Sequence, residues 1–322
     1  MNVSASSVTI DQGEIRSSIL GDGHGADVTM NIETLNVTGG GAVVAGADSS
    51  SLGLPSQSGT ITVNATDSIS ITGTNPNDPG ILSRIENVTG GSDTTLAGDI
   101  LLTTKRLEVA DQGRISYETT GLAQGNGIMI DASESVTIGS GGKVRMSSSF
   151  GEGTIPGVID ITSPVVSLSD VGAIQTSTAG GASAGPVNIH TGTLTLSTHS
   201  FITSESTQGI GAGGPITIDA TDSVILSGGS TISSSTQFLG APAGSIAITA
   251  GNLVSLNGTE TSLLSQTSGA GSGGTITVQT PQVQITDGAV ISAKSTGSGA
   301  AGNVVIEGTQ SPAQSVLIDG VG

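Results

Sequence analysis

The chain has 322 residues, a formal net charge of −18, 51 glycines and no cysteine. An acidic surface repels phosphate backbones, which argues against nucleic-acid binding, and the lack of cysteine excludes disulfides and thiolate metal sites. Aromatic residues make up 1% of the chain, and the apolar residues are mainly Val, Ile, Leu and Ala, a mixture that favours strands.

The N-terminal stretch MNVSASSVTI carries neither the basic n-region nor the apolar h-region of a signal peptide. No apolar run approaches the roughly 20 residues that span a membrane. We therefore predict no membrane span. If the protein is exported, we expect its export signal to lie outside this sequence.

An alternating apolar motif of the type ITI recurs along the chain with a period near 30 residues. Such a period with strand-type content is typical of a solenoid. The first apolar residues of the successive motifs are Val28, Ile61, Ile100, Ile128, Ile159, Val187, Ile216, Ile246, Ile276 and Val304.

Each repeat contains three apolar segments, as in Ile216, Val224 and Ile232. The first two connections have nearly constant length, whereas the third varies and is rich in Gly, Ala, Ser and Pro. Two fixed corners and one variable corner predict a tube with three sides. Parallel strands need such return connections, because a hairpin cannot join them.

The predicted fold is therefore an all-β, three-sided parallel β-helix of about ten coils of ~30 residues. We assign residues 1–308 to one β-helix domain and residues 309–322 to a tail that forms a partial coil or a linker. Side chains such as Ile216 and Ile218 are expected to fill a narrow aliphatic lumen, while Thr217 faces outward. Gly and Asn at the corners are expected to supply left-handed backbone angles.

The segment GTNPNDPG, residues 73–80, lengthens one of the otherwise fixed corners. Asn, Pro, Asp and Gly are favourable turn residues. We predict a protruding loop at this corner.

The run AGPVNIHTGTLTLSTHSFITSESTQGIGAGGPITIDA, followed by DGAVISAKSTGSGAAGNVVIEG, resembles the repeats of filamentous-haemagglutinin-like exoproteins of the two-partner secretion class. The resemblance covers roughly residues 58 to 307. It implies a right-handed β-helix that is exported through an outer-membrane barrel and displayed as an adhesin or fibre. The TNPND segment is similar to the NPN-type motifs of that family's secretion domain, but it lies inside a repeat corner, where we interpret it as a turn. The chain is then expected to be an interior piece of a longer exoprotein.

Catalysis is a second possibility, because polysaccharide-cleaving enzymes also use parallel β-helices. Such enzymes need clustered carboxylates and a base. Asp67, Glu134 and Asp222 occupy equivalent repeat positions but lie in coils that are not adjacent, so we interpret them as solvated turn residues. We predict no catalytic residues and no enzyme activity.

Five of the eight basic residues lie between residues 99 and 152, together with the single tyrosine. The repeat register predicts Arg114 beside Lys143 and Ser116 beside Arg145 on the third side, where Glu108, Glu118 or Asp131 could neutralise them. A compensated surface patch and a binding site for an anionic sugar both remain open. The candidate ligand-binding residues are Lys105, Arg106, Arg114, Tyr117, Lys143 and Arg145, with Phe150 nearby.

The three histidines are not expected to form a ligand set, so we predict no metal site and no cofactor. Ice binding is disfavoured because the outward row of the first side mixes Thr with apolar and acidic residues, such as Leu101 and Asp160.

Together these observations predict a non-enzymatic shaft or passenger segment of a secreted, surface-displayed adhesin. The alternative is a carbohydrate-binding or polysaccharide-cleaving β-helix protein. The expected partners are the outer-membrane secretion barrel during export and glycans or proteins of host cells, bacterial cells or matrix. Uncapped β-edges also predict end-to-end self-association.

Overall fold

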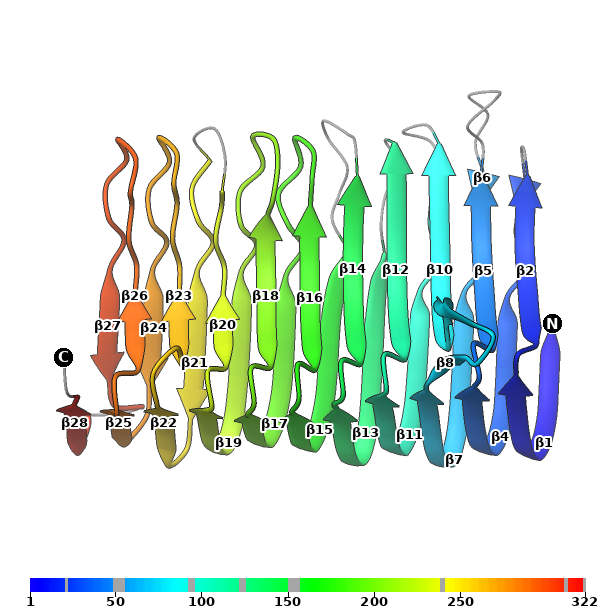
Figure 1. The fold of residues 1–322 in the computed structure, drawn as a ribbon, viewed down its shortest axis with the longest axis horizontal. Helices are drawn as coiled ribbons and strands as arrows, with labels where there is room; N and C mark the ends of the chain where they lie inside the picture. Colours follow the sequence, from blue (N-terminus) through cyan, green and yellow to red (C-terminus); the bar gives the residue numbers. More distant parts are fainter. Residues whose placement is uncertain are drawn as a thin grey trace.

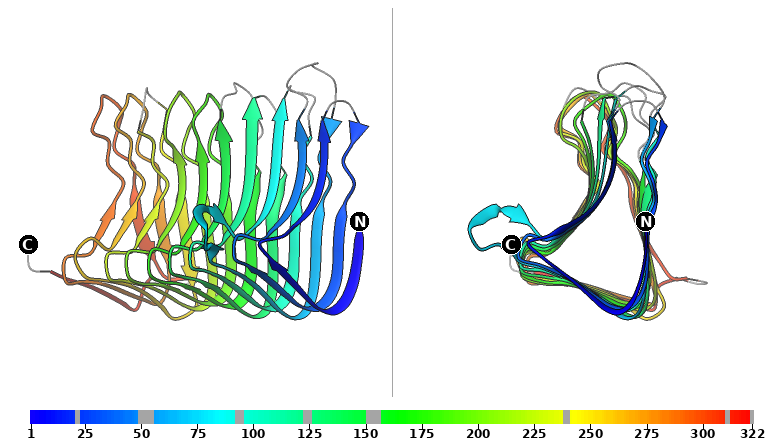
Figure 2. Two further views of the ribbon diagram at one scale, coloured as in Figure 1. Left: turned by 45° about the vertical axis from the view of Figure 1, so that its right-hand side comes forward. Right: turned by 90° about the vertical axis from the view of Figure 1, so that its right-hand side faces the viewer.

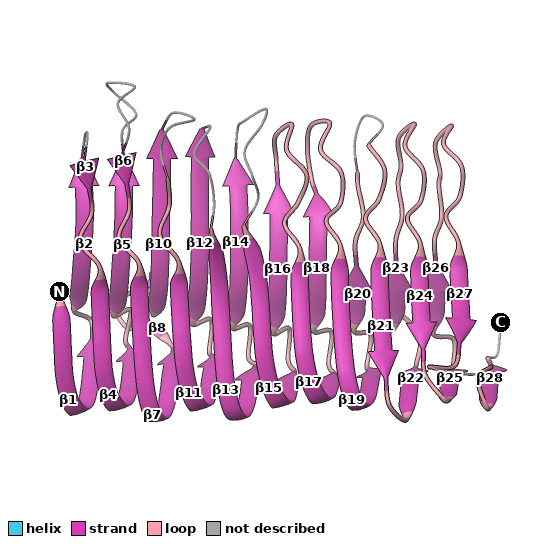
Figure 3. Cartoon of the chain, turned by 180° about the vertical axis from the view of Figure 1, so that it is seen from behind, coloured by secondary structure: helices cyan, strands magenta, loops and turns pink. Residues whose placement is uncertain are grey.

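The computed structural model describes residues 1–20, 23–48, 56–91, 96–121, 126–149, 157–237, 241–309 and 312–320. Within these residues the chain consists of strands, turns and loops, and it contains no helix (Figure 3). The strands stack side by side along one axis, from the N-terminus to the C-terminus (Figure 1).

Each coil follows three sides of a triangular tube (Figure 2). In most coils one long strand bends to cover the first and second sides, and a separate strand covers the third side. Seen from the N-terminal end, the chain turns clockwise as it moves away from the viewer, so the helix is right-handed (Figure 2). The predicted right-handed, three-sided parallel β-helix of about ten coils is thus confirmed.

The larger sheet covers the first and second sides. Its main ladder runs through β1 (Asn2–Asp11), β4 (Val28–Thr38), β7 (Ile61–Thr72), β11 (Ile100–Ala110), β13 (Gly127–Ile138), β15 (Val158–Leu168), β17 (Val187–Leu196), β19 (Ile216–Ser227), β21 (Ile246–Ala250), β24 (Ile276–Gln279) and β27 (Val304–Glu307). Towards the C-terminus the long strand divides in two, and the second side continues through β22 (Leu253–Asn257), β25 (Gln282–Thr286) and β28 (Ser315–Asp319).

The third side is a separate parallel sheet. It consists of β2 (Glu14–Leu20), β5 (Ala42–Asp48), β10 (Arg84–Gly91), β12 (Arg114–Gly121), β14 (Lys143–Ser149), β16 (Ala173–Thr178), β18 (Phe201–Ser206), β20 (Thr231–Ser233), β23 (Ser262–Leu264) and β26 (Val290–Ser292). A short parallel pair joins β3 (Gly23–His24) to β6 (Ser56–Gln57).

The register agrees with the repeat predicted from the sequence. Val28 pairs with Ile61, Ile61 with Ile100, and the same row continues to Val304. In the tail, β28 pairs in parallel with β25, so this segment adds another strand to the second side.

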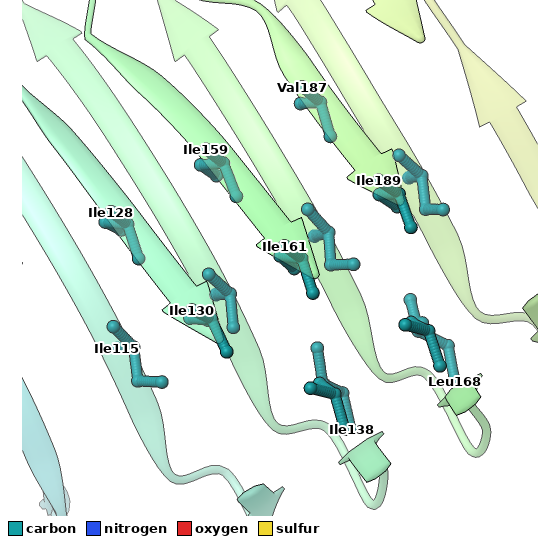
Figure 4. Close-up of a cluster of buried hydrophobic side chains, with 14 of the residues drawn as sticks. Ile115, Ile128, Ile130, Ile138, Ile159, Ile161, Leu168, Val187 and Ile189 are labelled. Carbon is teal, nitrogen blue, oxygen red and sulfur yellow. The ribbon is translucent and has the colours of Figure 1, made fainter. Parts of the chain in front are cut away.

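The lumen is filled by stacked aliphatic side chains. Ile128, Ile159 and Val187 form one column on the first side, and Ile138 and Leu168 belong to another on the second side (Figure 4). All five side chains are fully buried. Because identical positions stack coil upon coil, β-branched and leucine side chains fill a narrow lumen without large rings.

The corner between the second and third sides contains two consecutive residues with positive φ in most coils. The pairs are Gly39–Gly40, Asp111–Gln112, Ser140–Gly141, Asp170–Val171, Thr198–His199, Gly228–Gly229 and Asp287–Gly288. The predicted left-handed corners are confirmed. The expectation that Gly and Asn supply them holds for Gly alone, because the other positions carry Asp, Gln, Ser, Val, Thr or His.

Polar side chains close the lumen where the third side meets the returning chain. Ser204 Oγ donates to the carbonyl of Gly185 (2.7 Å), and Ser234 Oγ donates to the carbonyl of Gly214 (2.5 Å). The chain approaches so closely here that a Cβ at Gly214 would lie 2.3 Å from both the Ala184 oxygen and Ser204 Oγ. Beyond this seal, the coils whose loops the structure describes extend into a narrow loop before the next long strand begins, as after β16 and β18 (Figure 2).

The extended corner forms an antiparallel hairpin of β8 (Thr74–Asn75) and β9 (Asp78–Leu82). Asn75 Oδ1 accepts the Asn77 amide at 2.9 Å, and Asp78 Oδ1 accepts the Gly80 amide at 3.1 Å. The hairpin projects from the corner before β10, as the turn chemistry predicted (Figures 1 and 2).

Candidate functional site

The outer face of the third side carries a row of residues that begins beside this hairpin. The row runs in register through Arg84, Arg114, Lys143, Ala173 and Phe201 on successive coils. We call it the basic row. Its position follows from strand alternation, because Ile85, Ile115 and Val144 point into the lumen and their preceding neighbours therefore point out.

A second outward row runs alongside the basic row, two residues further along each strand. It contains Glu86, Ser116, Arg145 and Gln175. Thus Arg114 neighbours Lys143, and Ser116 neighbours Arg145, as the repeat register predicted. Adjacent coils are about 4.8 Å apart, so like charges in these positions lie close together.

Two carboxylates neutralise part of this positive charge. Arg84 Nε contacts Glu86 at 2.9 Å, and Arg145 Nη2 contacts Glu118 at 3.4 Å. Of the three acids that the sequence offered as neutralising partners, Glu118 fills that role here. Four cations therefore face two carboxylates in these three coils.

Arg114 lies at the centre of the cluster and is only partly exposed. Its Nε is buried and has no hydrogen-bond partner in the part of the chain that the structure describes. Burial lowers the pKa of Arg114, and the positive charges of Arg145 and Arg84 lower it further, against the opposing effect of Glu118 and Glu86. This guanidinium is partly desolvated without a direct counter-ion.

Lys143 is in a similar environment. Burial lowers its pKa first, followed by the charges of Arg114 and Arg145. Its ammonium lies 5.9 Å from the centre of the Phe201 ring, two coils along. The intervening residue, Ala173, is small and fully buried, so the lysine side chain has room to extend along the axis towards the ring.

The other sequence-predicted site residues lie elsewhere. Lys105 and Arg106 are exposed at the corner between the first and second sides, where the register of β11 shifts. Arg106 bridges two coils, contacting Asp67 at 2.6 Å and Glu134 at 2.9 Å. Asp67 and Glu134 are therefore structural partners of one arginine, and their coils are not adjacent.

Tyr117 faces the lumen and is 1% exposed. Its hydroxyl accepts a hydrogen bond from the Asn126 amide at 2.8 Å, and burial raises its pKa. Tyr117 is thus part of the seal rather than of the surface patch. Phe150 lies outside the described residues. Arg114, Lys143 and Arg145 are the three predicted residues that the fold brings together.

Arg84 and Phe201 complete the site and were not selected from the sequence. Both occupy the same repeat position as Arg114 and Lys143, immediately before the first inward residue of the third segment. Extending the repeat register by one coil towards the N-terminus and two towards the C-terminus would have identified them. Arg84 was hidden by the hairpin that lengthens its coil.

His190 and His199 belong to one coil, but they lie at different corners of it and have separate partners. His190 Nδ1 is 3.4 Å from Asp219, and His199 Nε2 is 3.6 Å from Glu260. In the described ranges, no group of three or more His, Cys, Asp or Glu residues could hold a metal ion. A search for a membrane-spanning helix over the same ranges finds none of sufficient length and apolarity.

Comparisons of the chain with known protein families, with curated proteins and with solved structures give no match.

Proposed function

We propose that this chain is a segment of the shaft of a secreted, surface-displayed bacterial adhesin or fibre, without enzyme activity. In this role the protein is exported through an outer-membrane barrel and holds binding elements away from the cell. The repeat resemblance to filamentous-haemagglutinin-like exoproteins supports this proposal.

The observation that carries the proposal is the uninterrupted parallel ladder from β1 to β27. Ten or so coils at about 4.8 Å each give a rod of about 50 Å. Backbone hydrogen bonds run along the axis of this rod, and every coil adds the same increment of length. A fold of this kind is suited to setting a distance.

Surface display can be tested on intact cells of the source organism. We expect antibodies against the chain to label unbroken cells, and external protease to remove that signal while a cytoplasmic marker is untouched. Signal confined to lysed cells would refute the proposal.

The modular role of the coil can be tested by deletion. Removing residues 187–215 joins Gly185–Pro186 to Ile216, which restores the native Gly–Pro–Ile junction of Gly214–Pro215–Ile216. Because Ile159, Val187 and Ile216 occupy one ladder, the shortened chain retains its register. We expect it to fold and to be displayed, with a rod shorter by one coil in small-angle scattering.

The control removes half a coil, residues 187–200. This deletion attaches the third-side strand β18 where a first-side strand is needed, so we expect misfolding and loss of display. Equal behaviour of the two deletions would contradict the modular rod.

A further inference from the structure

The basic row is positively charged, whereas the molecule as a whole is strongly negative. The chain carries 26 acidic residues and 8 basic ones, yet four of the basic ones gather on the third side around two carboxylates. In such an acidic chain a cation readily finds two carboxylates, as Arg106 does with Asp67 and Glu134.

Partial burial makes this arrangement unfavourable for the free protein. A guanidinium that loses water without gaining a counter-ion costs free energy, and neighbouring like charges add to that cost. Arg114 and Lys143 have no ion-pair partner within 4.0 Å among the described residues, and Arg114 Nε is an orphaned donor. An anion bound between them would satisfy both.

The cations and the aromatic ring are also ordered along the axis of the solenoid. Arg114 and Lys143 lie on successive coils of one row, Arg145 is on the adjacent row, and Phe201 follows two coils beyond Lys143. Cations thus repeat along the axis, and an aromatic ring lies at one end of the row. A single small anion would use only part of this surface, whereas a chain of anionic units laid along the axis would use its full length.

We propose that the outer face of the third side binds an anionic polysaccharide laid along the solenoid axis, with Arg114, Lys143 and Arg145 contacting its carboxylate or sulfate groups and Phe201 packing against a sugar ring. Arginine forms paired hydrogen bonds with planar oxyanions, and lysine supplies a point charge. Ser116, which donates to Glu86 at 3.1 Å, borders the three cations.

The biological setting of this site, adhesion to a glycan-coated surface, rests on the proposed function, but the binding chemistry does not. The test therefore uses the purified full chain. Heparin supplies sulfate groups, polygalacturonate supplies carboxylates alone, and dextran is the neutral control. All three are titrated by calorimetry at about 0.15 M salt, where the Debye length is about 8 Å and repulsion from distant acids is screened.

We expect the chain to bind at least one of the two polyanions and not dextran. Arg114→Gln, Lys143→Gln and Arg145→Gln should each weaken binding about tenfold, because each removes a charge-assisted hydrogen bond. Phe201→Ala should weaken it without changing the dependence on salt. Binding of heparin alone assigns sulfate as the ligand group, and binding of polygalacturonate assigns carboxylate.

Lys105→Gln and Lys294→Gln are matched controls, since they make the same change in net charge at exposed positions off the third side or near its C-terminal end. They should change the dissociation constant by less than about twofold. Arg114→Gln should melt at or above the temperature of the parent, because it removes a partly buried charge, so weakened binding cannot be ascribed to unfolding. Binding of neither polyanion, or equal losses in site and control variants, would overturn the proposal. Either result leaves the cell-surface labelling test of the shaft unaffected.

Discussion

Val171 is a β-branched residue held in the left-handed region, with φ of 64°. Its counterparts in neighbouring coils are Gly141, with φ of 74°, and His199, with φ of 58°. The left-handed region costs an L-amino acid about 1–2 kcal/mol, and branching at Cβ makes the conformation unusual. The residue is 50% exposed, so replacing its side chain removes little packing. Val171→Gly should therefore relieve strain.

The expected gain in unfolding free energy is about 1 kcal/mol. Relief of the backbone strain contributes about 1–2 kcal/mol. Glycine stabilises the unfolded chain by about 0.4–1 kcal/mol, which is subtracted from this gain. For a chain of this length the melting temperature should rise by about 1–3 °C in scanning calorimetry. Hydrogen exchange should slow at the residue 171 amide, which donates to the Thr198 carbonyl at 3.1 Å.

The reverse substitution, glycine to valine, can be made at Gly141, which occupies the same position in the preceding coil. A Cβ at Gly141 would meet only Gln112 Cγ at 3.7 Å, an ordinary contact, so Gly141→Val tests the backbone angle without a clash at Cβ. It should destabilise the protein by a similar amount. If Val171→Gly lowers the melting temperature, or if Gly141→Val leaves it unchanged, the argument that the positive φ strains Val171 is refuted.

Three further substitutions test other parts of the structure. Gly214→Ala should cost about 1–3 kcal/mol, because its Cβ would lie 2.3 Å from Ser204 Oγ, whereas Gly13→Ala, with no contact closer than 3.8 Å, should be tolerated; equal melting temperatures would refute the close approach. Burial raises the pKa of Glu205 in the folded protein. The buried carboxylate therefore destabilises the fold increasingly as the pH rises from the pKa of Glu205 in the unfolded chain to its higher pKa in the folded protein. Glu205→Gln should therefore raise the melting temperature at pH 7 more than at pH 4, and a gain that does not depend on pH would contradict this. Arg106→Gln should lower the urea midpoint only slightly, and not at all at 1 M salt, because both of its ion pairs are exposed; a large loss that persists at 1 M salt would mean that the bridge organises the corner.

The repeat was predictable because one physical requirement fixes it. A residue such as Ile216 must face the lumen and pair with Ile246 and Val187, so its period appears directly in the sequence. The same alternation places Tyr117 on the inward side, two residues after Ile115, although its chemistry drew attention to the surface. The strand rule was sufficient for this residue.

The remaining features depend on contacts between coils. The sequence of Asp170 and Val171 does not signal a left-handed corner, since stacking on the coils to either side imposes it. The same holds for Gly214, which is required by the backbone of the preceding coil rather than by its own φ. The basic row was predicted in part. The repeat spacing gave the register of Arg114 and Lys143, but it could not show that Arg114 is partly buried.

The seal at Ser204 and Gly214 separates the length of a loop from the geometry of the coil beneath it. Since the hydroxyl closes the lumen at the Gly185 carbonyl, the loop between Ser206 and Gly213 lies outside the packed lumen. Its ends are held to the preceding coil by hydrogen bonds from the Thr207 amide to the Thr178 carbonyl and from the Ala184 amide to the Ala212 carbonyl, both 2.9 Å, and Gln208 lies between these two bonds. A foreign peptide grafted at Gln208 should leave both sheets intact. Grafts on successive coils would then lie about 4.8 Å apart along a line, so the molecule is suited to serve as a scaffold that presents epitopes or enzymes at fixed spacing.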